Sequence, residues 1–205
     1  MYKIYDLINR LFQHQSLQTE KSISDNFIRE IVSGGQTGVD RAALDVAIEL
    51  KILHGGWCPH GRKSEDGTIA TTYKLREAPA PTLEESLKDS DAIFKKRTEL
   101  NVRDADGTLI ILKAAPVSGT LYTITMAEKY NKPCLILDLS TNFKIADIAD
   151  WIIKNNIRKL NIAGPRASQT IGIYEAAYDV LQDLLNHPLL NNKQDGLTEK
   201  RRLRL

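Results

Sequence analysis

The sequence predicts an α/β fold in which helices cover both faces of a mostly parallel central sheet. Short apolar runs rich in β-branched residues alternate with helical patterns from about residue 29 onward. A glycine-rich segment follows the first run, and two further glycine-containing polar clusters follow later runs. Parallel strands need crossover connections, which helices supply, so this alternation favours a layered sheet.

Each element follows from its local pattern. The expected strands cover residues 30–33, 52–55, 108–112, 134–138 and 159–162. The expected helices cover residues 39–50, 82–88, 91–100, 120–130, 144–155 and 173–185. The helix over residues 39–50 has the clearest apolar face, and Thr37 is expected to cap it. Its apolar residues are Val39, Ala43, Val46, Ala47 and Leu50.

The length of 205 residues fits one domain with small appendages. We place the domain at residues 29–187, a helical arm and linker at residues 1–28, and a basic tail at residues 188–205. Tyr5, Ile8, Leu11 and Phe12 recur at helical spacing in the arm. We expect the arm to pack on the domain or on a neighbouring copy of the chain.

Bulk composition excludes several classes of protein. A net charge of +2 gives no indication of a nucleic-acid partner, and the basic tail is typical of a solvated chain end. No apolar run approaches the roughly 20 residues that span a bilayer, and residues 1–10 lack a secretory pattern. Two cysteines do not indicate a disulfide framework, so we expect a cytoplasmic location.

The first polar cluster, SGGQTGVDR at residues 33–41, leads from a strand into a helix. Its glycines permit close approach of a ligand to backbone N–H groups, and the helix dipole attracts anions. The spacing matches neither the dinucleotide fingerprint nor a Walker A loop, and a tight structural turn is the alternative. The candidate binding residues are Gly34, Gly35, Gln36, Thr37, Gly38, Asp40 and Arg41.

The second cluster, GGWCPHGRKSEDG at residues 55–67, offers a flat indole, a forked guanidinium and two carboxylates. These groups suit a base or sugar attached to phosphate. Its candidate binding residues are Trp57, Cys58, Pro59, Arg62 and Glu65. Cys58, His60 and His54 lack the four-ligand spacing of a zinc site, so we expect no metal. The alternative is a long surface loop.

A third group of candidates precedes or follows the later strands. Arg97 and Asn101 lie four residues apart on one expected helix, where they could point at one target. Ser118, Gly119 and Thr120 begin another helix, which is an anion-binding position or simply a capped end. The last loop contributes Gly164, Pro165, Arg166 and Ser168, and Arg166 is the strongest candidate for clamping a phosphate or carboxylate.

Four motifs occur in the order SGGQTGVDRAALD, GGWCPHGRKSEDG, DGTLI and AGPRAS followed by GIY. In this order the sequence resembles the family named for molybdenum carriers, a circularly permuted branch of the SLOG superfamily of Rossmann-like nucleotide-binding proteins. The resemblance covers about residues 31–185. It implies a Rossmann-like three-layer sandwich, a homo-oligomer, and a ligand pocket formed by the glycine-rich loops.

The resemblance leaves the ligand and the activity open. The expected ligand is a nucleotide, the molybdenum cofactor or molybdate, held without turnover. The alternative is an N-glycosidic hydrolase, because the superfamily also includes phosphoribohydrolases with a PGGxGTxxE pattern; here Thr123 stands where that glutamate would be. The candidate acids for such chemistry are Asp40, Glu65, Asp66 and Asp104. A third possibility is a sensor whose pocket regulates a partner through the arm.

Overall fold

The computed structural model describes residues 28–113 and 118–190. Its centre is a five-stranded parallel sheet in the order β2-β1-β9-β7-β8. The strands are β1 (Glu30–Val32), β2 (Leu53–Gly55), β7 (Gly107–Leu112), β8 (Cys134–Asp138) and β9 (Lys159–Ala163). The expected parallel sheet is therefore confirmed, and every predicted strand is present.

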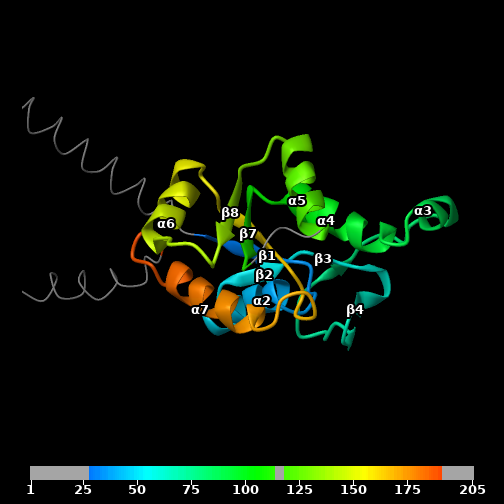
Figure 1. The fold of residues 1–205 in the computed structure, drawn as a ribbon, viewed down its shortest axis with the longest axis horizontal. Coiled ribbons are helices and arrows are strands. Elements are labelled where there is room, and N and C mark those ends of the chain that lie inside the picture. The colour runs from blue at the N-terminus through cyan, green and yellow to red at the C-terminus, as the bar shows by residue number, and fades with distance from the viewer. Residues whose placement is uncertain (1–27, 114–117, 191–205) are drawn as a thin grey trace, which may run out of the picture.

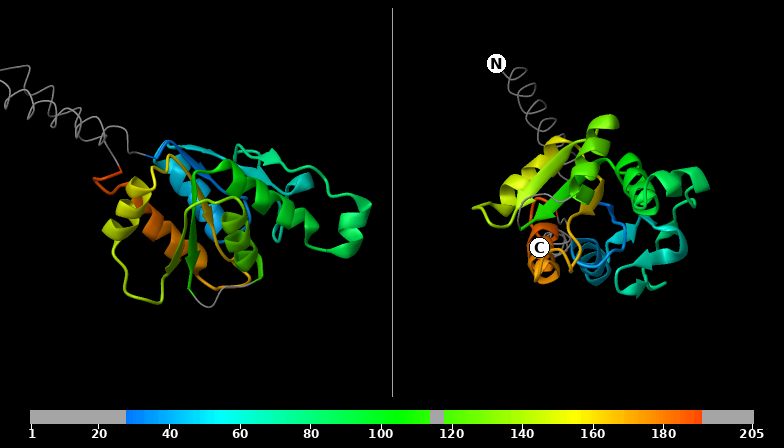
Figure 2. Two further views of the ribbon diagram at one scale, coloured as in Figure 1. Left: turned by 90° about the horizontal axis from the view of Figure 1, so that it is seen from above. Right: turned by 45° about the vertical axis from the view of Figure 1, so that its right-hand side comes forward.

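Helices cover both faces of this sheet (Figure 1, Figure 2). α2 (Val39–Glu49), α6 (Ile145–Lys154) and α7 (Ile173–Leu185) share the main apolar core with the strands. α4 (Ala92–Asp104) and α5 (Ser118–Lys129) pack together on the other face around Val102, Met126 and Ala127. The main core extends to Ile28 and Leu190, the first and last described residues. The arrangement is a Rossmann-like three-layer sandwich.

The strand order creates a crevice at the carboxyl edge of the sheet. The chain moves outward from β1 to β2 in one direction and from β7 to β8 in the other, and β9 lies between β1 and β7. In open parallel sheets, ligands bind where the connections diverge in this way. The segments that follow β1, β7 and β9 all begin at this edge.

A small subdomain between β2 and α4 was predicted as a loop with one short helix. β3 (Trp57–Cys58) pairs with β6 (Arg76–Glu77), and β4 (Lys63–Ser64) pairs with β5 (Gly67–Thr68) after the 3-10 turn η1 (His60–Arg62). Two-residue strands carry no periodic pattern, which explains why sequence patterns did not predict them. α3 (Leu83–Lys88) begins with a capping box between Thr82 and Glu85.

The expectation that Thr37 caps α2 was wrong. Gly38 is the N-cap residue, with φ 75°, and it makes no side-chain capping bond. The Thr37 hydroxyl instead donates to Glu65 and accepts from the Ala167 N–H. It therefore joins loops rather than completing the helix end.

The expected helix of the arm lies outside the described residues, as does most of the basic tail. In the part of the chain that the structure describes, no helix combines the length and apolar character needed to cross a membrane.

Candidate functional site

Glu65 joins the three glycine-containing clusters at the carboxyl edge of the sheet. Its carboxylate accepts hydrogen bonds from the Thr37 hydroxyl in the first cluster and from the Ser168 N–H and hydroxyl in the third, which covers residues 161–168. Arg166 Nε lies 3.5 Å from Glu65 Oε2. Burial raises the pKa of Glu65, but the bonds from Ser168 and Thr37 outweigh it and hold the pKa below its ordinary value. Glu65 is therefore ionised and connects the loops; we call its hydrogen bonds with Thr37 and Ser168 the Glu65 latch.

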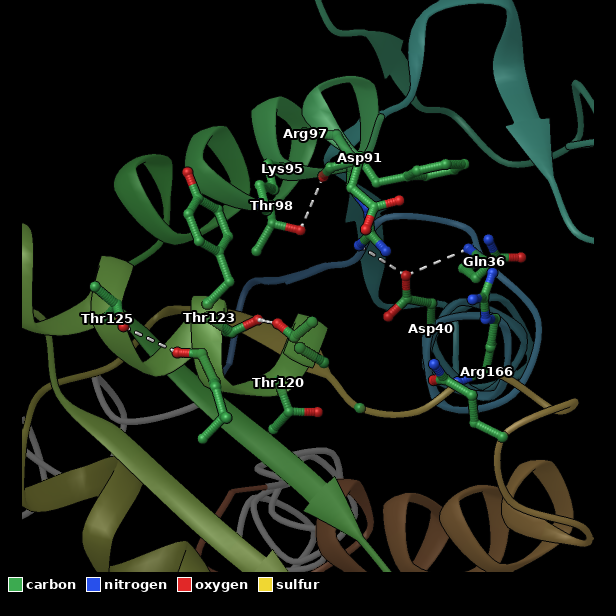
Figure 3. A pocket seen from close by; sticks show the side chains of 17 residues that line it. Gln36, Asp40, Asp91, Lys95, Arg97, Thr98, Thr120, Thr123, Thr125 and Arg166 are labelled. Atoms are coloured by element: carbon green, nitrogen blue, oxygen red, sulfur yellow. Dashed lines mark hydrogen bonds and ion pairs between the residues drawn. The ribbon is translucent and has the colours of Figure 1, made fainter. Parts of the chain in front are cut away.

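Beside this latch lies a cavity of about 400 Å³ between the loops and the α4–α5 pair (Figure 3). Seven residues predicted from the sequence as candidates line it: Gln36, Asp40, Arg97, Gly119, Thr120, Gly164 and Arg166. Ten others also line it: Asp91, Phe94, Lys95, Thr98, Leu121, Tyr122, Thr123, Thr125, Ala163 and Gln169. The structure thus brings candidates from the first cluster, from α4, from the start of α5 and from the loop after β9 to one space, whereas no candidate of residues 55–67 lines it.

An ion pair between Asp40 and Arg97 forms part of the cavity wall. Arg97 donates to Asp40 Oδ2 across 2.9 Å, and the Gln36 N–H donates to the same oxygen across 3.3 Å. The Asp40 side chain is only 3% exposed. Burial raises its pKa above the ordinary value, although Arg97 opposes that shift. A carboxyl group with a raised pKa in a cavity is typical of functional sites.

Gly34 makes this ion pair sterically possible. A Cβ built on Gly34 would lie 1.9 Å from an Arg97 guanidinium nitrogen and 2.8 Å from Asp40 Oδ2. The first glycine of the cluster is therefore needed for the approach of two side chains to the backbone.

Two buried polar atoms at the cavity have no hydrogen-bond partner among the described residues. They are Thr120 Oγ1, in the first turn of α5, and Arg97 Nε. Thr120 as a whole is 4% exposed. Leaving a buried polar atom unpaired costs about 1–3 kcal/mol, so such atoms call for an explanation. Both atoms belong to residues that line the same cavity.

The sequence of the chain matches a model of the Circularly permutated YpsA SLOG family over residues 31–185. The chain belongs to this family. A crystal structure named "Putative molybdenum carrier protein", from Syntrophus aciditrophicus, is 45% identical in sequence with a TM-score of 0.68. The match covers 77% of this chain and 95% of that one. No curated protein matches the chain.

Several predicted residues of this SLOG domain do not line the cavity but support the loops around it. Arg41 pairs with both oxygens of Asp66, at 2.5 and 3.0 Å, and this pairing lowers the pKa of Asp66 to about 2. Arg62 donates to the backbone carbonyls of four residues: Ile69, Ala70, Tyr73 and Leu75. Both guanidinium groups thus hold the small subdomain together.

Trp57 and Asn101 form a second supporting contact away from the cavity lining. The Asn101 amide accepts from the Trp57 N–H across 2.7 Å and donates to the Trp57 carbonyl across 2.9 Å. The Trp57 indole N–H donates to Asp104. The guanidinium carbon of Arg76 lies over the same indole, 4.2 Å from the ring centroid. Arg97 and Asn101 therefore do not point at one target: Arg97 faces the cavity and Asn101 fixes a strand.

The remaining predicted residues lie around the cavity in loops, in β3 and at the start of α5. Gly35, Gly38 and Pro165 are not part of the cavity lining, and neither are Cys58 and Pro59. α5 begins at Ser118, two residues before the predicted start at Thr120, and includes Gly119. Cys58 is buried, and burial raises the pKa of its thiol.

Within the described residues, no three His, Cys, Asp or Glu side chains gather as metal ligands would.

Sequence reasoning missed the part of the cavity that α4 and the middle of α5 supply. Asp91, the N-cap residue of α4, is followed by Phe94, Lys95 and Thr98 at positions i+3, i+4 and i+7, a spacing that places residues on one face of a helix. From the sequence, residues 91–100 were predicted only to form a helix. A signal was present in the polar character of that face, but only the packing of α4 against α5 shows that it borders a cavity.

Proposed function

We propose that this SLOG domain binds the phosphate or another oxyanion group of a small ligand in the cavity. The observation that carries the proposal is the unpartnered hydroxyl of Thr120. It lies in the first turn of α5, where backbone N–H groups lack intrahelical acceptors and the helix dipole favours negative charge. A bound oxyanion would accept hydrogen bonds from the Thr120 hydroxyl and from these backbone N–H groups.

The charges around Thr120 support the same ligand class. Lys95, Arg97 and Arg166 line the cavity with Asp40 and Asp91, so cationic side chains outnumber acidic ones in the lining even when Asp40 is ionised. Lys95 also pairs with Asp89, and Arg166 with Glu65, which lie outside the lining. Burial favours the neutral form of Asp40, which increases that excess. Arg97 also has a spare donor at Nε, and guanidinium groups suit phosphate oxygens.

The name of the similar Syntrophus aciditrophicus protein suggests which anion the cavity binds. If this chain has the role that the name gives that protein, the bound anion is molybdate or the phosphate of the molybdenum cofactor. A nucleotide presents the same phosphate group. The cavity chemistry described so far is common to these ligands.

Thermal unfolding against a panel of ligands tests the proposal. The panel contains inorganic phosphate, molybdate, tungstate, nucleoside mono-, di- and triphosphates, and dinucleotides. A ligand at about a hundred times its dissociation constant adds about 2.7 kcal/mol to stability. For the ligand that shifts the midpoint most, Thr120→Val is expected to weaken binding about tenfold or more, because it removes a hydrogen bond to a charged group.

Thr68→Val is the matched control, because Thr68 is exposed on β5 and lies outside the cavity lining. It is expected to leave binding unchanged. The proposal fails if no oxyanion in the panel stabilises the protein, or if Thr120→Val and Thr68→Val bind it equally well.

A second candidate function is N-glycosidic hydrolysis, favoured by one observation. Asp40 is a buried cavity carboxyl with a raised pKa, as a general acid or base at neutral pH would need. Thr123, which stands in place of the glutamate of the phosphoribohydrolase pattern, donates its hydroxyl to the Gly119 carbonyl. Release of free base from nucleoside monophosphates, abolished in Asp40→Asn, would establish this activity; binding without release would exclude it for those substrates.

A further inference from the structure

β8 forms one edge of the central sheet and pairs with β7 alone among the described strands. The Pro133 carbonyl accepts a hydrogen bond from β7 across 2.9 Å, and the Leu139 N–H donates to β7 across 2.8 Å. Backbone groups alternate in direction along a strand, so those of Cys134, Ile136 and Asp138 point away from β7. Outward N–H and C=O groups of this kind are a template for a further strand.

The sequence of β8 does not protect this edge. Proteins usually protect an edge strand with lysine, proline or a bulge, or cover it with another segment. β8 reads CLILD, and its only charge is at its last residue. Cys134 and Ile136 share one face of the strand, but the α4–α5 cluster reaches Cys134 only, and Ile136 is 46% exposed. An apolar β-branched side chain thus lies in water beside unpaired backbone groups.

The opposite edge, formed by β2, is shorter and partly covered. β2 has three residues and β8 has five. The N–H of Lys74, in the small subdomain, donates to the His54 imidazole of β2 across 3.4 Å. Leu53 is 71% exposed on β2, which makes it a matched reference for Ile136. In the part of the chain that the structure describes, β8 is therefore the more open edge.

Charge at the two ends of β8 favours a second copy of this chain in antiparallel orientation. Asp138 ends the strand and accepts from the Ser140 hydroxyl and N–H across 2.7 and 2.9 Å; these bonds lower its pKa and keep it ionised. Lys132 lies two residues before the strand, and Glu128 four residues before Lys132. Parallel pairing would place two Asp138 carboxylates together. Antiparallel pairing brings Asp138 of each copy near the Lys132 end of the other.

α5 extends the surface beyond the strand itself. A stable interface buries roughly 800 Å² per partner, more than one short strand supplies. Tyr122 and Met126 of α5 pack toward α4. By helical spacing Leu121 and Ile124 lie on the opposite side of α5, which faces the β8 edge, and Leu121 is 53% exposed. An antiparallel pair of β8 strands sets the two α5 helices on the same face, with these apolar side chains between them.

We propose that two copies of this chain join β8 edge to β8 edge in a two-fold dimer, with the strands antiparallel about Ile136. The Ile136 N–H and C=O exchange hydrogen bonds with those of Ile136 in the second copy, and the Asp138 N–H donates to the Cys134 carbonyl. The Asp138 carbonyl already accepts from the Thr141 N–H across 3.1 Å, so the pairing ends there. The two sheets become one, and the two cavities open at opposite edges of it.

Sedimentation equilibrium of the full chain is the first test. We expect a mass twice that of the 23.0 kDa chain. Ile136→Lys is expected to raise the dissociation constant of the dimer about a hundredfold or more, because two ammonium groups meet at the axis. Leu53→Lys places the same charge on the other edge strand and is expected to leave the dimer intact. Circular dichroism checks that both variants keep the native fold.

Cross-linking identifies the surface even if Ile136→Lys does not fold. Residues opposite each other in a hydrogen-bonded antiparallel pair have Cα atoms about 5.5 Å apart, within the range of a disulfide. In a Cys134→Ser background, mild oxidation of Ile136→Cys is expected to give a disulfide-linked dimer, and Leu53→Cys to give none. The inference is overturned if the native chain sediments as a monomer, or if its dimer survives Ile136→Lys and Ile136→Cys forms no disulfide.

Discussion

Asp40 and Asp91 are the two acidic residues in the lining of a cavity that also contains Lys95, Arg97 and Arg166. The Asp40 carboxyl group is buried, accepts hydrogen bonds from Arg97 and Gln36, and has a raised pKa. When it is ionised it neutralises Arg97 and repels a bound phosphate; when it is neutral it does neither. The protonation state of this one residue therefore controls how strongly the cavity attracts an anion.

We expect the affinity for adenosine 5′-monophosphate to fall as pH rises through the pKa of Asp40. The raised pKa means that the neutral, permissive form persists to higher pH than for an ordinary aspartate. Asp40→Asn is expected to bind more tightly than the native protein at pH values above the pKa of Asp40, and to remove this part of the pH dependence. Titration calorimetry between pH 4 and 8 checks both, with the ligand's own ionisation common to the two proteins. If Asp40→Asn instead binds the nucleotide more weakly than the native protein, the Asp40 carboxylate contributes favourably to binding.

At the scale of elements, the glycine-containing loops depend on one another through Glu65. The first and third loops each donate to its carboxylate, and Gln36 Oε1 accepts from the Glu65 N–H across 3.0 Å. These bonds span segments 28 and 103 residues apart in the chain. The loops therefore form one unit although no secondary structure joins them.

Glu65→Gln is expected to increase hydrogen–deuterium exchange in residues 34–38 and 163–168 together. The amide removes the charge that Arg166 and Ser168 stabilise and replaces one acceptor with a donor. Ser168→Ala should act in the same direction because it removes one latch bond. Glu84→Gln, which alters an exposed ion pair on α3, is the control. Faster exchange confined to the second cluster would contradict the latch.

Gly164 and Gly119 form a matched pair of site glycines with opposite expected effects. A Cβ on Gly164 would lie 2.4 Å from the Ile111 carbonyl oxygen and 2.6 Å from Val39, whereas one on Gly119 would meet nothing within 4 Å. Gly164→Ala is expected to cost about 1–3 kcal/mol in urea unfolding, and Gly119→Ala to gain about 0.5 kcal/mol by helix propensity. Equal effects would show that the loop after β9 tolerates a side chain.

The elements themselves were largely predictable from the sequence. β8 and α7 have the predicted bounds, because a buried strand and a strongly amphipathic helix carry clear periodic patterns. α4 continues to Asp104, four residues beyond the prediction, since Asn101 and Trp57 extend its packing. The meeting of the loops followed from parallel topology. The aromatic side of the cavity did not, because Phe94 borders a space that exists only after α4 packs on α5.

At the scale of the whole molecule, acidic groups hold separate parts of the fold together in ionised form. Glu99 connects the two helices of the α4–α5 pair: it accepts from Lys129 and from Tyr130, just beyond the end of α5, across 2.8 and 2.7 Å. These bonds lower its pKa to about 2. Asp66 has a similarly low pKa through Arg41, and Asp104 a lowered one through Arg103 and Trp57. Asp40 is the exception, with a raised pKa.

Global stability is therefore expected to fall on acidification. A carboxyl group whose folded pKa is lowered contributes stability that is present above its unfolded pKa, near 4 to 4.5, and is lost as pH falls toward about 2. These lowered groups should contribute a nearly constant amount to the free energy of unfolding from neutrality to about pH 5 and a decreasing amount below it. Asp40, neutral at low pH, contributes in the opposite direction and reduces the slope.

Glu99→Gln isolates the contribution of one carboxyl group to this pH dependence. The Glu99 side chain is 17% exposed and its partner Lys129 is 54% exposed, so we discount the shift for solvent screening and expect a loss of about 2 kcal/mol at pH 7. The difference from the native protein should shrink as pH falls and be small by pH 2, which is close to the pKa of Glu99 in the folded protein. Urea unfolding at a series of pH values measures it, with Glu128→Gln, exposed on α5, as the control. A difference that persists unchanged at pH 2 would mean that Glu99 acts through packing rather than charge.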